Sequence, residues 1–109
     1  MTLSELVTLL HGTGYPVSFS HFDTDDDNPP PPPPFITYMT PSDEALYADD
    51  RNYYNMTDVD IELYTRGKDL DAERSIESIF SDNDIPYVAS QRWIDGEKVF
   101  QKLYEVRLI

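Results

Sequence analysis

The stretch from Val59 to Phe80 constrains the fold most, because an alternating strand pattern runs directly into an amphipathic helix pattern. Apolar and polar residues alternate from Val59 to Thr65, which is typical of a strand buried on one face. Asp69 then occupies an N-cap position, and apolar residues follow it at helical spacing. We therefore expect this helix to pack on the strand and to bury Ile61, Leu63, Ile76, Ile79 and Phe80.

A shorter helix is predicted at the N-terminus, where leucines and a valine from Leu3 to Leu10 recur at helical spacing. Thr2 and Glu5 have the spacing of a capping box, which favours a helix start. Gly12 and Gly14 follow the pattern and are expected to end the helix.

Strands are predicted over residues 15–19, 35–39, 87–94 and 99–109. Asp95 and Gly96 form a hairpin signal between the last two, and Asn83 is expected to end the second helix in the left-handed conformation. The resulting order is α-β-β-β-α-β-β. It predicts one α+β domain over residues 1–109, with a mainly antiparallel mixed sheet of four to five strands and two helices on one face.

Residues 23–34 form an acidic, proline-rich segment within this domain. Prolines cannot donate to a sheet and favour an extended polyproline II conformation, so the six consecutive prolines predict a stiff, solvated loop between two strands. A ligand for an SH3-like domain is a weaker alternative, because the flank is acidic rather than basic. The aspartates also lack the glycine and closing glutamate of an EF-hand loop, so no metal site is expected among Asp23, Asp25, Asp26 and Asp27.

The charge is strongly negative and uneven along the chain. There are 21 acidic and 8 basic residues, a formal net charge of −13, and residues 1–62 contain a single base, Arg51. Such a charge repels phosphates and disfavours conventional nucleic-acid binding. Three interpretations remain: a solubilising surface, a surface that DNA passes without sticking, and a mimic of DNA.

The chain shows no pattern of catalytic residues. Its two histidines, His11 and His21, lie at the ends of predicted elements, where packing roles are more common than catalysis. It has no phosphate-binding glycine loop, no nucleophile-elbow pattern and no cysteine. We expect no enzyme activity, no cofactor and no metal. No apolar run reaches the length of a membrane span, so no membrane partner is expected.

Several aromatic residues are candidate contacts with another subunit or partner. They are Tyr47, Tyr53 and Tyr54 in an irregular segment, and Trp93. Tyrosine covers a large area with few rotatable bonds, which makes it common at interfaces. The alternative is that the tyrosines pack their segment onto the sheet.

The chain resembles a family of small tailed-phage proteins. The resemblance is carried by Pro33–Tyr38, by Tyr47–Arg51 and by Val59–Thr65 ahead of an aspartate-rich helix start, and it continues with Tyr87, the loop from Trp93 to Lys98 and Tyr104–Val106. These segments resemble the tail-completion or head–tail joining proteins of siphophages, which are similar in fold to the tail terminators. The resemblance spans Leu3 to Leu108 and departs at the proline run, which is shorter in relatives.

The resemblance implies a structural virion protein without enzyme activity or cofactor. Such a subunit forms a ring, typically a hexamer, at the neck of the virion. Its implied partners are further copies of itself, the head-completion or connector protein, the tail tube protein and the genomic DNA that passes through. Its implied location is the head–tail junction, after assembly in the bacterial host cytoplasm.

A ring role would place acids on the wall of the DNA channel. The candidates are the loop acids Glu44, Asp49 and Asp50 and the polar face of the predicted strand, Asp58, Asp60 and Glu62. A tail terminator that caps the tail tube is an alternative of the same class. A DNA-mimic inhibitor is an alternative of another class, although the acids cluster in loops and at helix starts rather than along one regular face.

Overall fold

A computed structural model describes residues 1–22, 24–27, 29–41 and 57–108 of the chain. The predicted α+β class and the predicted element order are confirmed. The elements are α1 (Leu3–His11), β1 (Val17–Phe19), β2 (Phe35–Met39), β3 (Thr57–Thr65), α2 (Leu70–Asp82), β4 (Tyr87–Ile94) and β5 (Val99–Leu108).

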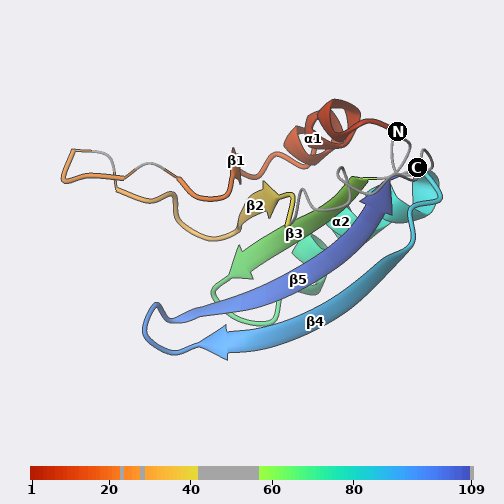
Figure 1. Cartoon of the computed structure of the whole chain (residues 1–109). Coiled ribbons are helices and arrows are strands. Elements are labelled where there is room, and N and C mark those ends of the chain that lie inside the picture. Colours follow the sequence, from red (N-terminus) through yellow and green to blue (C-terminus); the bar gives the residue numbers. More distant parts are fainter. Residues whose placement is uncertain (23, 28, 42–56, 109) are drawn as a thin grey trace.

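The five strands form one mixed sheet in the order β1-β2-β3-β5-β4, with β3 at its centre (Figure 1). β3 pairs antiparallel with β2 and with β5, and β4 pairs antiparallel with β5 along its whole length. The two edges of the sheet are therefore β1, which is three residues long, and β4, which is eight residues long.

The β1–β2 pair is the parallel pair of this sheet, with Val17 opposite Ile36 and Phe19 opposite Tyr38. A parallel pair needs a connection of about a dozen residues or more, because the chain must return to the starting end of the first strand. Residues 20–34 supply that length, and in Figure 1 they extend away from the sheet before coming back. The acidic, proline-rich segment is thus part of a connection long enough to permit the parallel addition of β1.

Both helices pack on one face of the sheet. The fully buried side chains of α1 (Leu6, Leu10) and of α2 (Ala72, Ile76, Phe80) belong to one cluster with those of β3. In Figure 1, α2 lies behind the sheet, and no described helix lies on the opposite face, which we call the uncovered face. Four of the five predicted core residues are at most 1% exposed, whereas Ile79 is only partly buried at the margin of the cluster.

The helix starts follow the predicted capping chemistry. Thr2 accepts from the backbone N–H of Glu5, whose carboxylate accepts in return from the N–H of Thr2. Asp69 accepts from the N–H of Ala72. The predicted left-handed stop at Asn83 is wrong by one residue: Asn83 has φ −114°, and Asp84 has φ +54°. Aspartate tolerates this conformation nearly as well as asparagine, so the two were hard to separate by type.

A nearly buried ionic cluster fixes α2 to the sheet. Glu73 of α2, whose side chain is 6% exposed, accepts from Lys102 Nζ of β5 at 2.6 Å and lies 2.9 Å from Lys68 Nζ. Glu77 accepts from Lys102 at 3.1 Å and from the Tyr104 hydroxyl at 2.6 Å. Lys102, which breaks the apolar alternation of β5, therefore has two carboxylate partners on the helix.

The β4–β5 hairpin has a four-residue loop, Asp95–Lys98, rather than a two-residue turn at Asp95 and Gly96. The residue with positive φ in this loop is Lys98, at +55°. The hairpin signal at Asp95 and Gly96 therefore located the turn correctly.

Candidate functional site

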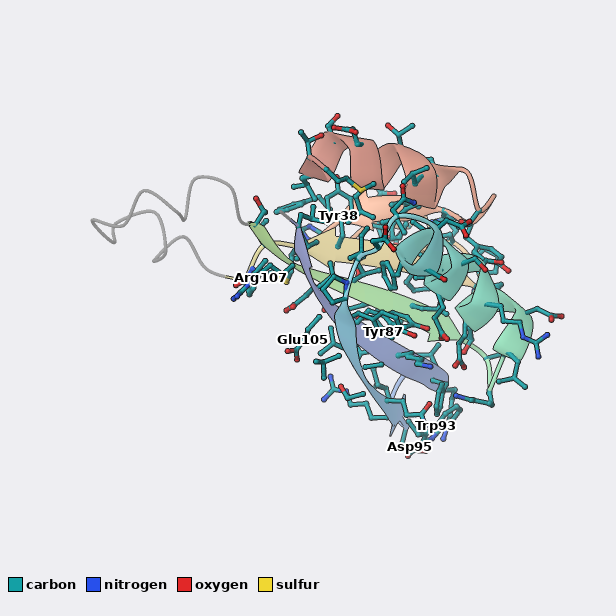
Figure 2. The ribbon with its side chains drawn as sticks, turned by 90° about the vertical axis from the view of Figure 1, so that its right-hand side faces the viewer. Tyr38, Tyr87, Trp93, Asp95, Glu105 and Arg107 are labelled. Atoms are coloured by element: carbon teal, nitrogen blue, oxygen red, sulfur yellow. The ribbon has the colours of Figure 1, made fainter. Side chains whose placement is uncertain are left out.

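The uncovered face of the sheet carries the acids that the sequence predicts for the polar side of β3. Asp58, Asp60 and Glu62 alternate with the buried residues of that strand, so they share the face opposite the helices. Glu105 and Arg107 of β5 lie on the same face, because they pair with Asp60 and Asp58. Figure 2 shows Glu105 and Arg107 on the side of the sheet away from α2. We call these five residues the acidic face.

Asp60 and Glu105 are directly opposite each other on neighbouring antiparallel strands. Side chains in this position have Cβ atoms about 5 Å apart, so two carboxylates repel each other. Partial burial, followed by the charges of Glu105, Glu62 and Asp58, raises the pKa of Asp60. The pair costs the isolated domain stability, and nothing in the described core needs it.

Asp58 and Arg107 form an ion pair on this face, which offsets the charge of one of its acids. Arg107 Nε donates to one oxygen of Asp58 at 2.8 Å, and its second nitrogen donates to the other oxygen at 3.3 Å. These hydrogen bonds hold the pKa of Asp58 below its usual value. The repulsive charge of the acidic face is therefore concentrated on Asp60, Glu62 and Glu105.

Glu62 lies in a polar cluster on the same face. Its Oε2 accepts from the Tyr64 hydroxyl at 2.5 Å, from Thr37 at 3.2 Å and from Gln101 at 3.3 Å. Burial and the hydrogen bond to Glu62 raise the pKa of Tyr64 to about 12. Gln101 in turn accepts from Arg92 of β4 at 2.9 Å. The cluster links side chains of four strands, and Glu62 accepts three hydrogen bonds in it through Oε2.

A shallow hollow of about 450 Å³ lies beside Asp60 and Glu105, lined by Pro41, Asp58, Asp60, Pro86, Tyr87, Val88, Glu105, Val106 and Arg107. No nucleophile with an adjacent base lines it. Within residues 1–22, 24–27, 29–41 and 57–108, no group of three or more histidines and acids is arranged to hold a metal ion. Asp60 and Glu105 make this part of the surface negative.

Trp93 and its strand are unusually exposed. All residues of β4 except Ile94 are exposed, including Tyr87 (40%), Val88 (69%) and Trp93 (48%). The Trp93 indole N–H donates to Asp95 at 3.3 Å, which orients the ring beside the hairpin loop (Figure 2). The predicted contact residue Trp93 thus lies on a free sheet edge.

The remaining predicted site residues have different outcomes. Glu44, Asp49, Asp50, Tyr47, Tyr53 and Tyr54 lie outside the described residues. The projecting loop exposes Asp25, Asp26 and Asp27. Both histidines are also exposed: His11 at the end of α1 and His21 just after β1. Glu105 was missing from the list of predicted face acids. The alternation of β5, which puts Glu105 opposite its apolar side, was the signal that could have found it.

Comparisons with protein-family models, with curated proteins and with solved structures return no match. In the described part of the chain, no helix is long and apolar enough to cross a membrane.

Proposed function

We propose that this protein is a ring-forming structural subunit of a tailed-phage virion, which joins the tail tube to the head connector and lets the genome pass through the ring. Its partners are then further copies of itself, most simply six, with the connector and the tail tube protein on either side. The acidic face lines the channel and prevents the DNA from adhering.

The observation that supports this proposal most is the Asp60–Glu105 pair at the centre of the uncovered face. Two carboxylates opposite each other destabilise a sheet, so their presence calls for a use outside the monomer. On a channel wall, a ring symmetry would repeat the pair in every subunit and build a strong negative field. The described residues offer no competing catalytic arrangement.

A tail terminator remains the nearest alternative, because it would need the same acidic wall and differs in the partner on one side. A DNA mimic fits the acidic face less well. A mimic needs several free carboxylates spaced along a surface, whereas Asp58 is paired with Arg107 and Glu62 accepts three hydrogen bonds. On the acidic face, Asp60 and Glu105 are therefore the carboxylates least engaged with other side chains.

The first test is location and assembly. Mass analysis and electron microscopy of the purified protein are expected to show rings, and labelled antibody is expected to bind the head–tail junction of phage particles. A protein that is absent from particles and instead inhibits a nucleic-acid enzyme as a monomer would overturn the proposal in favour of the mimic.

The second test addresses the acidic face. Particles carrying Asp60→Lys and Glu105→Lys are expected to assemble but to release their genome slowly, with the delay reduced at high salt because salt screens phosphate attraction. A matched pair, Asp82→Lys and Glu97→Lys, makes the same charge change at exposed positions of α2 and the hairpin loop. Equal ejection rates for the two double variants would show that the acidic face does not line the channel.

A further inference from the structure

The free edge of β4 is the most unusual surface among the described residues. β4 pairs with β5 over eight residues, yet it contributes no buried side chain to the hydrophobic cluster, and its one ring contact with the core is Tyr87 against Phe80 and Tyr104. A long exposed edge presents unpaired backbone donors and acceptors, and proteins usually protect such edges with charges, prolines or bulges. The one charged residue of β4 is Arg92, which is engaged with Gln101. The edge is therefore open to another strand.

Exposed apolar side chains gather at both edges of the sheet. Six large hydrophobic residues are exposed among the described residues, and three of them, Tyr87, Val88 and Trp93, lie on β4. A fourth is Phe19 of β1, which is 53% exposed at the opposite edge. Four of the six therefore lie on the two edge strands, which together hold eleven residues. This is the distribution expected if the edges are covered by something else.

Acidic residues are absent from both edge strands. The chain has 21 acidic residues, but none occurs in residues 6–22, which include β1, or in residues 85–94, which include β4. Two copies with a net charge of −13 each repel one another, so a contact between copies is easiest where acids are absent. The charge distribution therefore favours a second copy of this chain as the occupant of each edge.

We propose that copies of this protein join head to tail through their sheet edges, with β4 of one copy pairing with β1 of the next. This inference rests on the proposed ring and names its subunit contact. The strand directions suit it. β1 is parallel to β2, and β2 is antiparallel to β3. β4 is parallel to β3, because both are antiparallel to β5. β1 and β4 therefore point in opposite directions. Copies related by rotation about a channel axis would therefore form an antiparallel pair, and a head-to-tail contact closes into a ring when the rotation permits.

The side chains restrict the pairing register. In an antiparallel pair, opposite residues share a face. Ser18 pairs with Thr37 and lies on the uncovered face, as do Val88, Ser90 and Arg92 of β4. Ser18 must therefore be opposite one of these three residues. If it is opposite Val88, then Phe19 is opposite Tyr87, and two exposed rings cover each other on the helix side.

Cysteine cross-linking tests this contact directly, because the chain has no cysteine of its own. We expect one of three double variants, Ser18→Cys combined with Val88→Cys, Ser90→Cys or Arg92→Cys, to give a ladder of covalent multimers with a short thiol-reactive cross-linker. The reaction is run on the purified protein at increasing salt, which weakens repulsion between copies. Each single variant is expected to give no covalent multimers, since the contact joins different strands and one cysteine would lack a partner.

The outcomes separate this inference from the proposed function. A dimer from Ser90→Cys alone would indicate a two-fold β4–β4 contact and overturn the head-to-tail arrangement, as would the absence of any ladder at high salt. A ladder from a protein that is absent from phage particles would support the contact and reject the virion role. A neck ring that forms without cross-linking of these positions would reject the contact and support the role.

A second pair of variants guards against effects on folding. Val88→Lys with Trp93→Lys adds two charges to the β4 edge and is expected to abolish the multimers while the far-ultraviolet circular dichroism stays unchanged. Leu70→Lys is the matched control, because Leu70 is 55% exposed at the start of α2, away from both edges. Multimers that survive the β4 variant, or that are lost equally with Leu70→Lys, would contradict the proposal.

Discussion

At the scale of single residues, the Asp60–Glu105 pair gives a stability prediction with a definite pH dependence. The pKa of Asp60 is raised in the folded protein, so its charge opposes folding at neutral pH. This penalty disappears as the pH falls through the raised pKa, because the folded protein then binds the proton more tightly than the unfolded chain. Asp60→Asn is expected to stabilise the protein at pH 7 by about 0.2–1 kcal/mol and to gain little in acid.

Thermal unfolding of Asp60→Asn, Glu105→Gln and the double variant checks this prediction. Either single variant removes the same repulsion, so their gains are expected not to add. A lower melting temperature for Asp60→Asn at pH 7 would show that the carboxylate makes a favourable contact in the folded state.

The charge of Glu73 stabilises the folded protein, whereas that of Asp60 destabilises it. Burial alone would raise its pKa, but hydrogen bonds from Lys102 and Lys68 outweigh burial and lower it. A lowered pKa contributes stability above the unfolded value, about 4.3, and this stability is lost as the pH falls through the folded value. Glu73→Gln is expected to cost about 1–3 kcal/mol at pH 7 and progressively less below pH 4.

Urea unfolding measures this difference, and Arg74→Gln is its control. Arg74 and Asp71 form a pair at 3.9 Å with side chains 75% and 94% exposed, so its loss is expected to cost no more than about 0.5 kcal/mol. Equal costs for the two variants would mean that the cluster beneath α2 contributes no more than a surface pair.

At the scale of elements, the acidic, proline-rich connection is expected to be dispensable for folding even though it links parallel strands. Replacing residues 25–32 by a short Gly-Ser link retains Phe22, whose ring meets Phe35 edge-on at 5.5 Å, and the Ser18 hydroxyl bond to the His21 carbonyl. Loop closure changes by only about 0.6 kcal/mol per doubling of length. The melting temperature is therefore expected to stay nearly unchanged.

Phe22→Ala is the control for that deletion, and it is expected to lower the melting temperature because it removes the ring contact with Phe35. A loss of stability on shortening the loop that equals or exceeds the effect of Phe22→Ala would show that the removed residues pack against the domain.

At the scale of the whole molecule, the described elements are expected to unfold together. β4 adds no buried side chain to the core, but it pairs over eight residues with β5, which supplies Tyr104, Val106 and Leu108 to the core. Trp93 is the only tryptophan and lies in β4 near the hairpin loop. Its fluorescence and the far-ultraviolet circular dichroism are expected to give the same midpoint in urea. An earlier fluorescence midpoint would show that the hairpin opens independently of the core.

The amino-acid sequence was enough to predict the element order, the strand–helix pair at its centre and the alignment of Asp58, Asp60 and Glu62 on one face. The physical reason is local: period-two and period-3.6 patterns and capping residues depend on near neighbours in the chain. Lys102 interrupts the apolar face of the last strand in the sequence, but its carboxylate partners Glu73 and Glu77 are found only in the folded structure.

Features that depend on which strands are neighbours in the sheet could not be predicted from the sequence and needed the folded structure. Nothing local to Asp60 reveals that Glu105 stands opposite it, since cross-strand pairing is set by the register of the whole β3–β5 ladder. The parallel addition of β1 and the exposed edge position of β4 are likewise properties of strand order. Tyr87–Ile94 has the composition of an ordinary strand. Its place at the end of the sheet leaves it largely exposed, although the Tyr87 ring contacts Phe80 of α2.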